Sequence, residues 1–202
     1  MSTKAAPHLR TLEISADVGP LLTVLHTVFP VLHLQELSLG PLYEGTGSLV
    51  LSFLRSCAET LVCLSLSFKM FHETTYDPAF CAGGGVSCLT ALETFSIGAH
   101  PKHIPDILRQ ITSKNLAHLN ITVSLRTSAP SDVDDLVGVL TTGSLAVSRP
   151  HVALIRSPLD IDMEKRGYNA PSSEDMRDAL LAGLQSLHKE GRLQLERFIG
   201  DD

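Results

Sequence analysis

The segment His33-Leu-Gln-Glu-Leu-Ser-Leu-Gly40 is one copy of a phrase that occurs five times in this chain. The other four copies are His8–Ser15, Thr60–Ser67, Ala91–Gly98 and Asn115–Thr122. All five follow the pattern x-L-x-x-[LF]-x-[LI]-x, and their first leucines lie 24 to 31 residues apart. A phrase that returns at a near-constant period of about 20–50 residues indicates a repeat protein, in which each unit packs mainly on its neighbours.

Each phrase predicts a short strand, because its last residues alternate between apolar and polar side chains. The segments between the phrases carry apolar residues at helical spacing, such as Val18, Leu22 and Leu25, or Ile104 and Leu108. A helix-length connection therefore separates successive strands, and we expect the strands to pair in parallel. The third interval between first leucines, from Leu61 to Leu92, is the longest. We interpret Phe71–Ser87, which holds Gly83-Gly-Gly85, as a loop inserted into this repeat.

The pattern fades beyond residue 125. Ser131 and Asp134 form a capping box, which predicts a helix over Val133–Leu140. The other expected elements are a strand, a polar connection, a long helix and a final strand, over His151–Ile155, Pro158–Asn169, Ser172–Glu190 and Leu193–Ile199. We expect the long helix to cap the last repeat, whereas the first strand begins at Leu9 with no cap before it. We therefore expect either a fragment of a longer protein or a short protein whose first layer docks on something else.

These phrases resemble those of the leucine-rich-repeat family, clearly over residues 8–125 and loosely beyond. The resemblance implies an α/β fold: an irregular solenoid with parallel strands on its concave face and helices on its convex face. It also implies a single repeat domain over residues 1–202, with degenerate repeats and the capping helix over 126–202. The Asn or Cys that follows the strand in this family is absent, and the residues near that place are Asp17, Leu42, Met70 and His100.

Composition excludes several classes of partner. The net charge of −6 comes without any cluster of Lys and Arg, which argues against nucleic acid. The N-terminus lacks the apolar region of a signal peptide, and no run approaches the roughly 18 apolar residues of a membrane helix. The four cysteines follow no secreted pattern, so we expect a cytoplasmic or nuclear protein with free, mostly buried thiols.

Candidate chemical motifs all have a plainer structural interpretation. The Gly83–Gly85 run lacks the Lys-Ser/Thr of a phosphate loop, and we interpret it as a flexible loop. His100 and His103 have no Cys in their own repeat to complete a metal site. Three acidic residues, Asp160, Asp162 and Glu164, could bind a hard cation, but a solvated loop is the simpler interpretation. We therefore expect no enzyme, no cofactor and no metal.

The concave face of such a solenoid should carry the outward residues of successive strands, and it is our candidate protein-binding surface. It comprises Thr11, Glu13, Glu36, Ser38, Cys63, Ser65, Thr94, Ser96, His118 and Asn120. This row is small and polar, and it lacks the Trp, Tyr and Arg that dominate binding energy in most interfaces. The alternative is that the main contacts lie on the segment Phe71–Phe80, through Phe71, Tyr76 and Phe80.

The sequence pattern of the repeats, with variable lengths and Leu-rich helices, resembles the repeat region of fungal F-box-type proteins. That resemblance implies a non-catalytic protein–protein interaction module that reads substrates for a ubiquitin-ligase adaptor. A Skp-type adaptor would bind only through an F-box in a longer form, because no F-box-like segment precedes Leu9. The alternative is a structural or effector-type repeat protein with no ubiquitin role.

Overall fold

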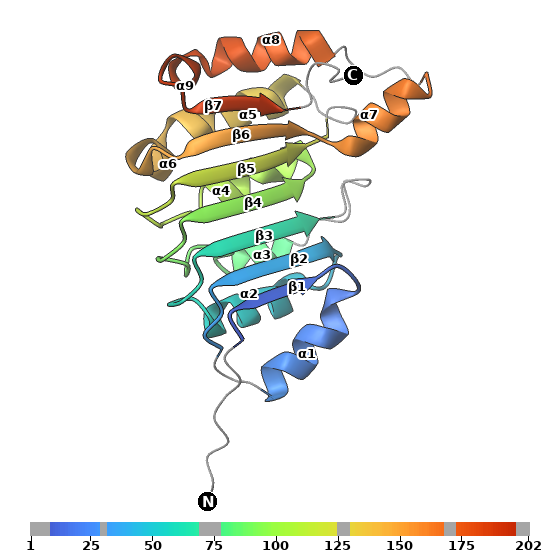
Figure 1. Cartoon of the computed structure of the whole chain (residues 1–202), viewed down its shortest axis with the longest axis vertical. Coiled ribbons are helices and arrows are strands. Elements are labelled where there is room, and N and C mark those ends of the chain that lie inside the picture. The colour runs from blue at the N-terminus through green and yellow to red at the C-terminus, as the bar shows by residue number, and fades with distance from the viewer. Residues whose placement is uncertain (1–8, 29–31, 69–77, 125–129, 168–172, 197–202) are drawn as a thin grey trace, which may run out of the picture.

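The computed structural model of the chain describes residues 9–28, 32–68, 78–124, 130–167 and 173–196. Seven strands of the described residues form one sheet, in which every neighbouring pair is parallel and the order is that of the chain (Figure 1). The strands are β1 Thr11–Ile14, β2 Glu36–Leu42, β3 Cys63–Phe68, β4 Thr94–Ala99, β5 His118–Val123, β6 His151–Arg156 and β7 Leu193–Glu196. The fold is therefore α/β with an open, all-parallel sheet, as the repeat phrases predict for β1 to β5.

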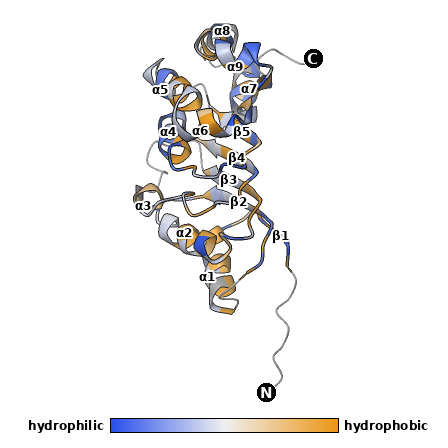
Figure 2. Ribbon diagram, turned by 90° about the vertical axis from the view of Figure 1, so that its left-hand side faces the viewer, coloured by the Kyte–Doolittle hydropathy of each residue, from blue (hydrophilic) through white to orange (hydrophobic). Residues whose placement is uncertain are grey.

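Helical segments connect the strands, and α1 to α6 lie to one side of the sheet (Figure 2). They are α1 Val18–Val28, α2 Gly47–Ser56, α3 Pro78–Ala82, the 3₁₀ helix η2 Pro101–His103, α4 Ile104–Leu108, α5 Pro130–Thr141, α6 Gly143–Ser148, α7 Pro158–Lys165, α8 Ser173–Gly183 and α9 Gln185–Lys189. The other face of the sheet carries the outward side chains of β1 to β7 and is called the open face below. No helix in the described part of the chain has both the length and the apolar character that crossing a bilayer requires.

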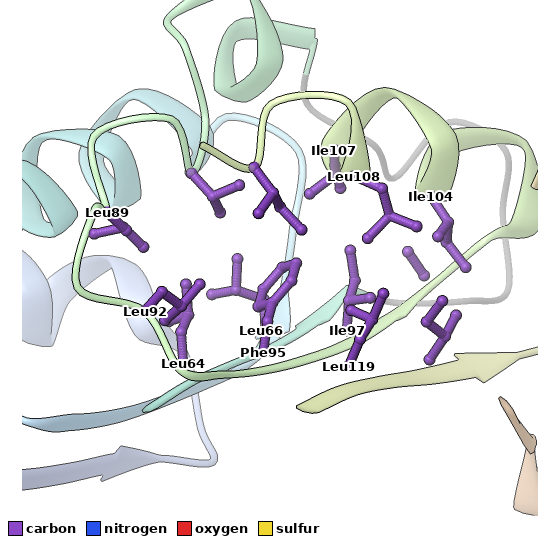
Figure 3. Packing of buried hydrophobic residues seen from close by; sticks show 14 of the residues in the cluster. Leu64, Leu66, Leu89, Leu92, Phe95, Ile97, Ile104, Ile107, Leu108 and Leu119 are labelled. Atoms are coloured by element: carbon purple, nitrogen blue, oxygen red, sulfur yellow. The ribbon is translucent and has the colours of Figure 1, made fainter. Parts of the chain in front are cut away.

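The core lies between the sheet and the helices, and the sheet contributes to it two rows of inward residues in register. One row is Leu37, Leu64, Phe95, Leu119 and Val152, and the other is Leu39, Leu66, Ile97, Ile121 and Leu154. Each of these ten side chains is at most 2% exposed. From above, Ile104 and Leu108 of α4 point toward Ile97 and Leu119 of the sheet (Figure 3). Because strand side chains alternate between faces, this burial leaves the polar residues of every phrase on the open face.

Side-chain hydroxyl groups form hydrogen bonds between successive repeats. The Ser113 Oγ donates to the carbonyl of Leu92 at 2.6 Å, and the Thr60 hydroxyl donates to the carbonyl of Leu34 at 2.8 Å. Leu92 and Leu34 are the first leucines of the preceding repeat phrases. Each bond therefore satisfies a loop carbonyl of one layer with a side chain of the next.

The two ends of the sheet differ. At β7, helices α8 and α9 and the residue between them bury Leu180, Leu184 and Leu187. At β1, Val18 and Leu22 of the predicted apolar stripe of α1 are fully buried, whereas Leu21 and Val24 are 43% and 57% exposed. Among the residues that the structure describes, β1 pairs with β2 alone.

Several local predictions are wrong, and the largest concerns residues 158–169. The expected polar connection is helix α7 over Pro158–Lys165, because proline suits a first helical turn and an acidic residue there favours the helix dipole. Asp160 is completely buried rather than solvated. Its carboxylate accepts a hydrogen bond from the Ser124 Oγ at 2.9 Å, so a partner at the end of β5 compensates for its burial. The side chain of Glu164 lies outside the described residues.

The expected inserted loop and the alternative binding segment also need correction. Pro78–Ala82 forms α3, and Phe80 is fully buried with its ring 5.9 Å from that of Phe68, at 64°. Phe80 is thus a core residue and presents no side chain to a partner. Phe71 and Tyr76 lie outside the described residues.

Three smaller corrections follow from local packing. Helix α5 begins at Pro130, so Ser131 lies within its first turn instead of capping it. The long C-terminal helix is two helices, α8 and α9, and Gly183, a poor helix former, ends the first. The four cysteines are free, but only Cys57 is buried; Cys63, Cys81 and Cys88 are half-buried.

Candidate binding face

The structure brings all ten predicted surface residues together on the open face, in two rows that cross the sheet. The first row follows the register Thr11, Glu36, Cys63, Thr94, His118 and His151. The second row is Glu13, Ser38, Ser65, Ser96, Asn120, Ala153 and Gln194. Identical phrase positions therefore align across strands, since each strand adds beside the last without a shift at these positions.

Neighbouring side chains contact each other along both rows. The Thr11 hydroxyl donates to the Glu36 carboxylate at 3.2 Å, and the Asn120 amide donates to the Ser96 Oγ at 3.0 Å. The His118 and His151 rings stack with their centroids 6.0 Å apart and an interplanar angle of 24°. These contacts hold several of the outward side chains in a defined arrangement.

A shallow hollow of about 230 Å³ lies over β1 to β4. Its floor includes Leu12 and Leu37, and its polar lining includes Ser38, Ser65 and Ser96 of the second row. Both charged side chains among the described residues that line it are acidic. They are Glu13 and Glu36.

A second hollow, of about 400 Å³, lies over β5 to β7. It is lined by His118, Asn120, His151, Val152, Ala153, Gly191, Arg192, Leu193, Gln194 and Glu196. Of these, only His118 and Asn120 belong to the predicted set. The alternation in His151-Val152-Ala153-Leu154 would have identified the outward residues of β6, but β6 and β7 do not repeat the leucine phrase.

Arg192 is held firmly at the edge of this second hollow. Its Nε donates to the Pro150 carbonyl at 3.2 Å, and its Nη1 donates to the Glu190 carboxylate at 2.9 Å. Arg149 donates to the same carboxylate oxygen at 2.9 Å. The bonds from Arg192 and then Arg149 lower the pKa of Glu190. Two guanidinium groups therefore share one carboxylate, so these three side chains together carry one positive charge in excess. The carboxylate of Glu196 also lines this hollow.

The groups that suggested other chemistry lie elsewhere. His100 is buried, its Nδ1 accepts a hydrogen bond from the Lys102 amide at 3.4 Å, and its ring lies 5.9 Å from that of His103. Among the residues that the structure describes, no three His, Cys, Asp or Glu side chains converge on a point that could hold an ion. Burial, together with the nearby Cys88, raises the pKa of Cys57 to about 12, so this thiol stays protonated and is a poor nucleophile.

Comparison with protein-family models, with curated proteins and with solved structures finds no match for this chain.

Proposed function

We propose that this chain is an irregular leucine-rich-repeat solenoid, a single domain over residues 1–202, and that its open sheet face is the concave face of such a solenoid. This face binds another protein without catalysing a reaction. The observation that carries the proposal is the pair of polar rows in register across the sheet, above a fully buried apolar layer. A rigid layer of this kind presents fixed donors and acceptors over a length that suits an extended partner.

The chemistry of the face supports contact with a polypeptide backbone. Its central side chains, Ser65, Ser96 and Thr94, are short and uncharged, so a partner chain could approach closely and exchange hydrogen bonds with their hydroxyls. No buried nucleophile or base is part of either hollow as the described residues line it. Both properties favour a binding surface over an active site.

The resemblance to F-box-type proteins extends this proposal to a role in the cytoplasm or nucleus, where the face would select substrates for a ubiquitin ligase. In that case an F-box carried by a longer form would bind the Skp-type adaptor. A structural or effector-type repeat protein with no ubiquitin role is the competing proposal. The two differ in whether adaptor and cullin accompany the protein in cells.

The test compares the tagged native chain with two arginine variants by quantitative affinity purification from native cells. Ser65→Arg places a long side chain in the centre of the open face. Ser144→Arg places the same side chain on the exposed surface of α6 and serves as the control. We expect a defined set of proteins to be lost with Ser65→Arg and retained with Ser144→Arg. If every associated protein survives both changes, the open face is not the binding surface.

The same purification addresses the ubiquitin role. A Skp-type adaptor and a cullin should be recovered with any form that carries an F-box. Their absence, together with partners that depend on Ser65, would favour the repeat protein without a ubiquitin role.

A further inference from the structure

The first row of the open face has a charge gradient. Glu36 on β2 stands near one end, and the neutral Cys63 and Thr94 follow on β3 and β4. His118 and His151 then stack on β5 and β6. Glu13 of the second row adds a second carboxylate beside Glu36 at the acidic end, because both line the same hollow.

Arg192 completes the opposite end of this row. It directly precedes Leu193, which pairs with Val152, so Arg192 lies beside His151 in the first row. The Arg192 guanidinium is fixed by the bonds to Pro150 and Glu190. Its side chain is 12% exposed and lines the second hollow, which makes it a pre-oriented cation at the edge of that hollow.

The other charged groups near the two ends do not cancel this gradient. Glu196 also lines the second hollow, but it is four residues beyond Arg192, which is about 13 Å along an extended strand. Glu190 binds both Arg149 and Arg192 and neutralises only one of the two. At the acidic end, the basic Arg10 precedes β1 and is not among the described residues that line the hollow.

We infer that the partner of the open face is an extended peptide segment that carries a basic side chain and, about six residues away, an acidic one. The basic side chain lies against Glu13 and Glu36, and the acidic one lies against His118, His151 and Arg192. Strands in a sheet are about 4.8 Å apart, so β2 and β6 are separated by about 19 Å, and an extended chain covers that distance in about six residues. This inference rests on the proposed function and specifies its partner.

The charge pattern acts mainly on specificity. Opposite charges at the two ends favour one direction of the bound peptide, and a reversed peptide would bring like charges together. The neutral serines between the ends accept any sequence with small side chains. Recognition therefore depends on the spacing of two charges rather than on one deep pocket.

The experiment is selection of random nine-residue displayed peptides on the whole chain, followed by fluorescence polarisation with the enriched peptides in synthetic form. We expect enriched peptides to carry a Lys or Arg and, five to seven residues away, an Asp or Glu. Glu36→Lys should weaken their binding about tenfold, because one attraction becomes a repulsion. Gln194→Glu changes an exposed residue at the other end of the face and should also weaken binding of these peptides, because it adds a negative charge there.

Two controls separate this inference from the function on which it rests. Glu59→Lys has the same charge change in an exposed turn after α2 and should leave the peptide dissociation constant unchanged. Enriched peptides whose binding is lost with Ser65→Arg, but which lack the two charges, would overturn the inference and leave the proposed binding function intact. If no enriched peptide is sensitive to Ser65→Arg, the proposed function itself fails.

A second copy of the chain is the competing occupant, because two copies facing each other in opposite directions would also pair acidic with basic ends. Light scattering across a concentration series distinguishes this case. A dimer that dissociates with Glu36→Lys would overturn the peptide inference. A monomer at all concentrations, with the expected charge pattern among the peptides, would support it.

Discussion

Replacing Leu66 by alanine tests the central packing of the sheet. Leu66 lies in β3, is 1% exposed, and stands between Leu39 and Ile97 in an inward row. The substitution removes three carbon atoms, and at about 0.8 kcal/mol for each buried methylene the lost transfer energy is about 2.4 kcal/mol. The cavity that remains in a layer held by neighbours on both sides adds to this, so we expect a total loss of about 3–4 kcal/mol.

The measurement is urea denaturation followed by far-ultraviolet circular dichroism. The midpoint should fall strongly while the slope of the transition stays the same, which indicates a change in stability alone. Ser65→Ala is the matched control, because Ser65 is the half-buried neighbour of Leu66 on the open face. It should change the free energy of unfolding by at most about 0.5 kcal/mol. If Ser65→Ala costs as much as Leu66→Ala, the strand does not present these faces, since a slip of one residue would exchange them.

Three further predictions concern the layers behind and beside the sheet. Ser113→Ala should cost about 1–3 kcal/mol in urea denaturation, because it leaves the Leu92 carbonyl without its 2.6 Å donor; an unchanged midpoint would show that water replaces the bond. Gly40→Ala should cost about 1–3 kcal/mol, because its Cβ would lie 2.6 Å from that of Ser67, and adding Ser67→Gly should recover part of the loss in a double-mutant cycle. Cys57 has a pKa raised from 9.0 to about 12, so the unfolded thiol ionises first as pH rises, and the free energy of unfolding should fall by about 1.4 kcal/mol for each pH unit between about 9 and 12. A Cys57→Ser variant should lose less stability over the same range, and equal slopes would contradict the assignment.

The open face over β1 to β5 could be predicted from the residues alone. Aligning the five phrases places Glu36, Cys63 and Thr94 at the same position, and the structure pairs these residues in register. The prediction works because a strand alternates its side chains with a period of two and each repeat has the same phrase. Both facts are local, and neither depends on a distant contact.

The basic end of the face could not be predicted in the same way. His151 and Arg192 belong to strands that do not repeat the leucine phrase, and Arg192 joins the first row only because Leu193 pairs with Val152. The orientation of its guanidinium depends on the Pro150 carbonyl, 42 residues earlier. The partner that fixes the side chain is far along the chain, so no short pattern encodes it.

Helix α7 and the residues around it show the same difference. The polar residues after β6 predict a solvated connection, yet Asp160 is buried there, where it accepts a hydrogen bond from Ser124, 36 residues away. Likewise, Phe80 enters the core through its contact with Phe68. Local periodicity predicts which face of a strand is apolar, whereas burying a carboxylate or an isolated aromatic ring depends on partners that only the folded chain brings together.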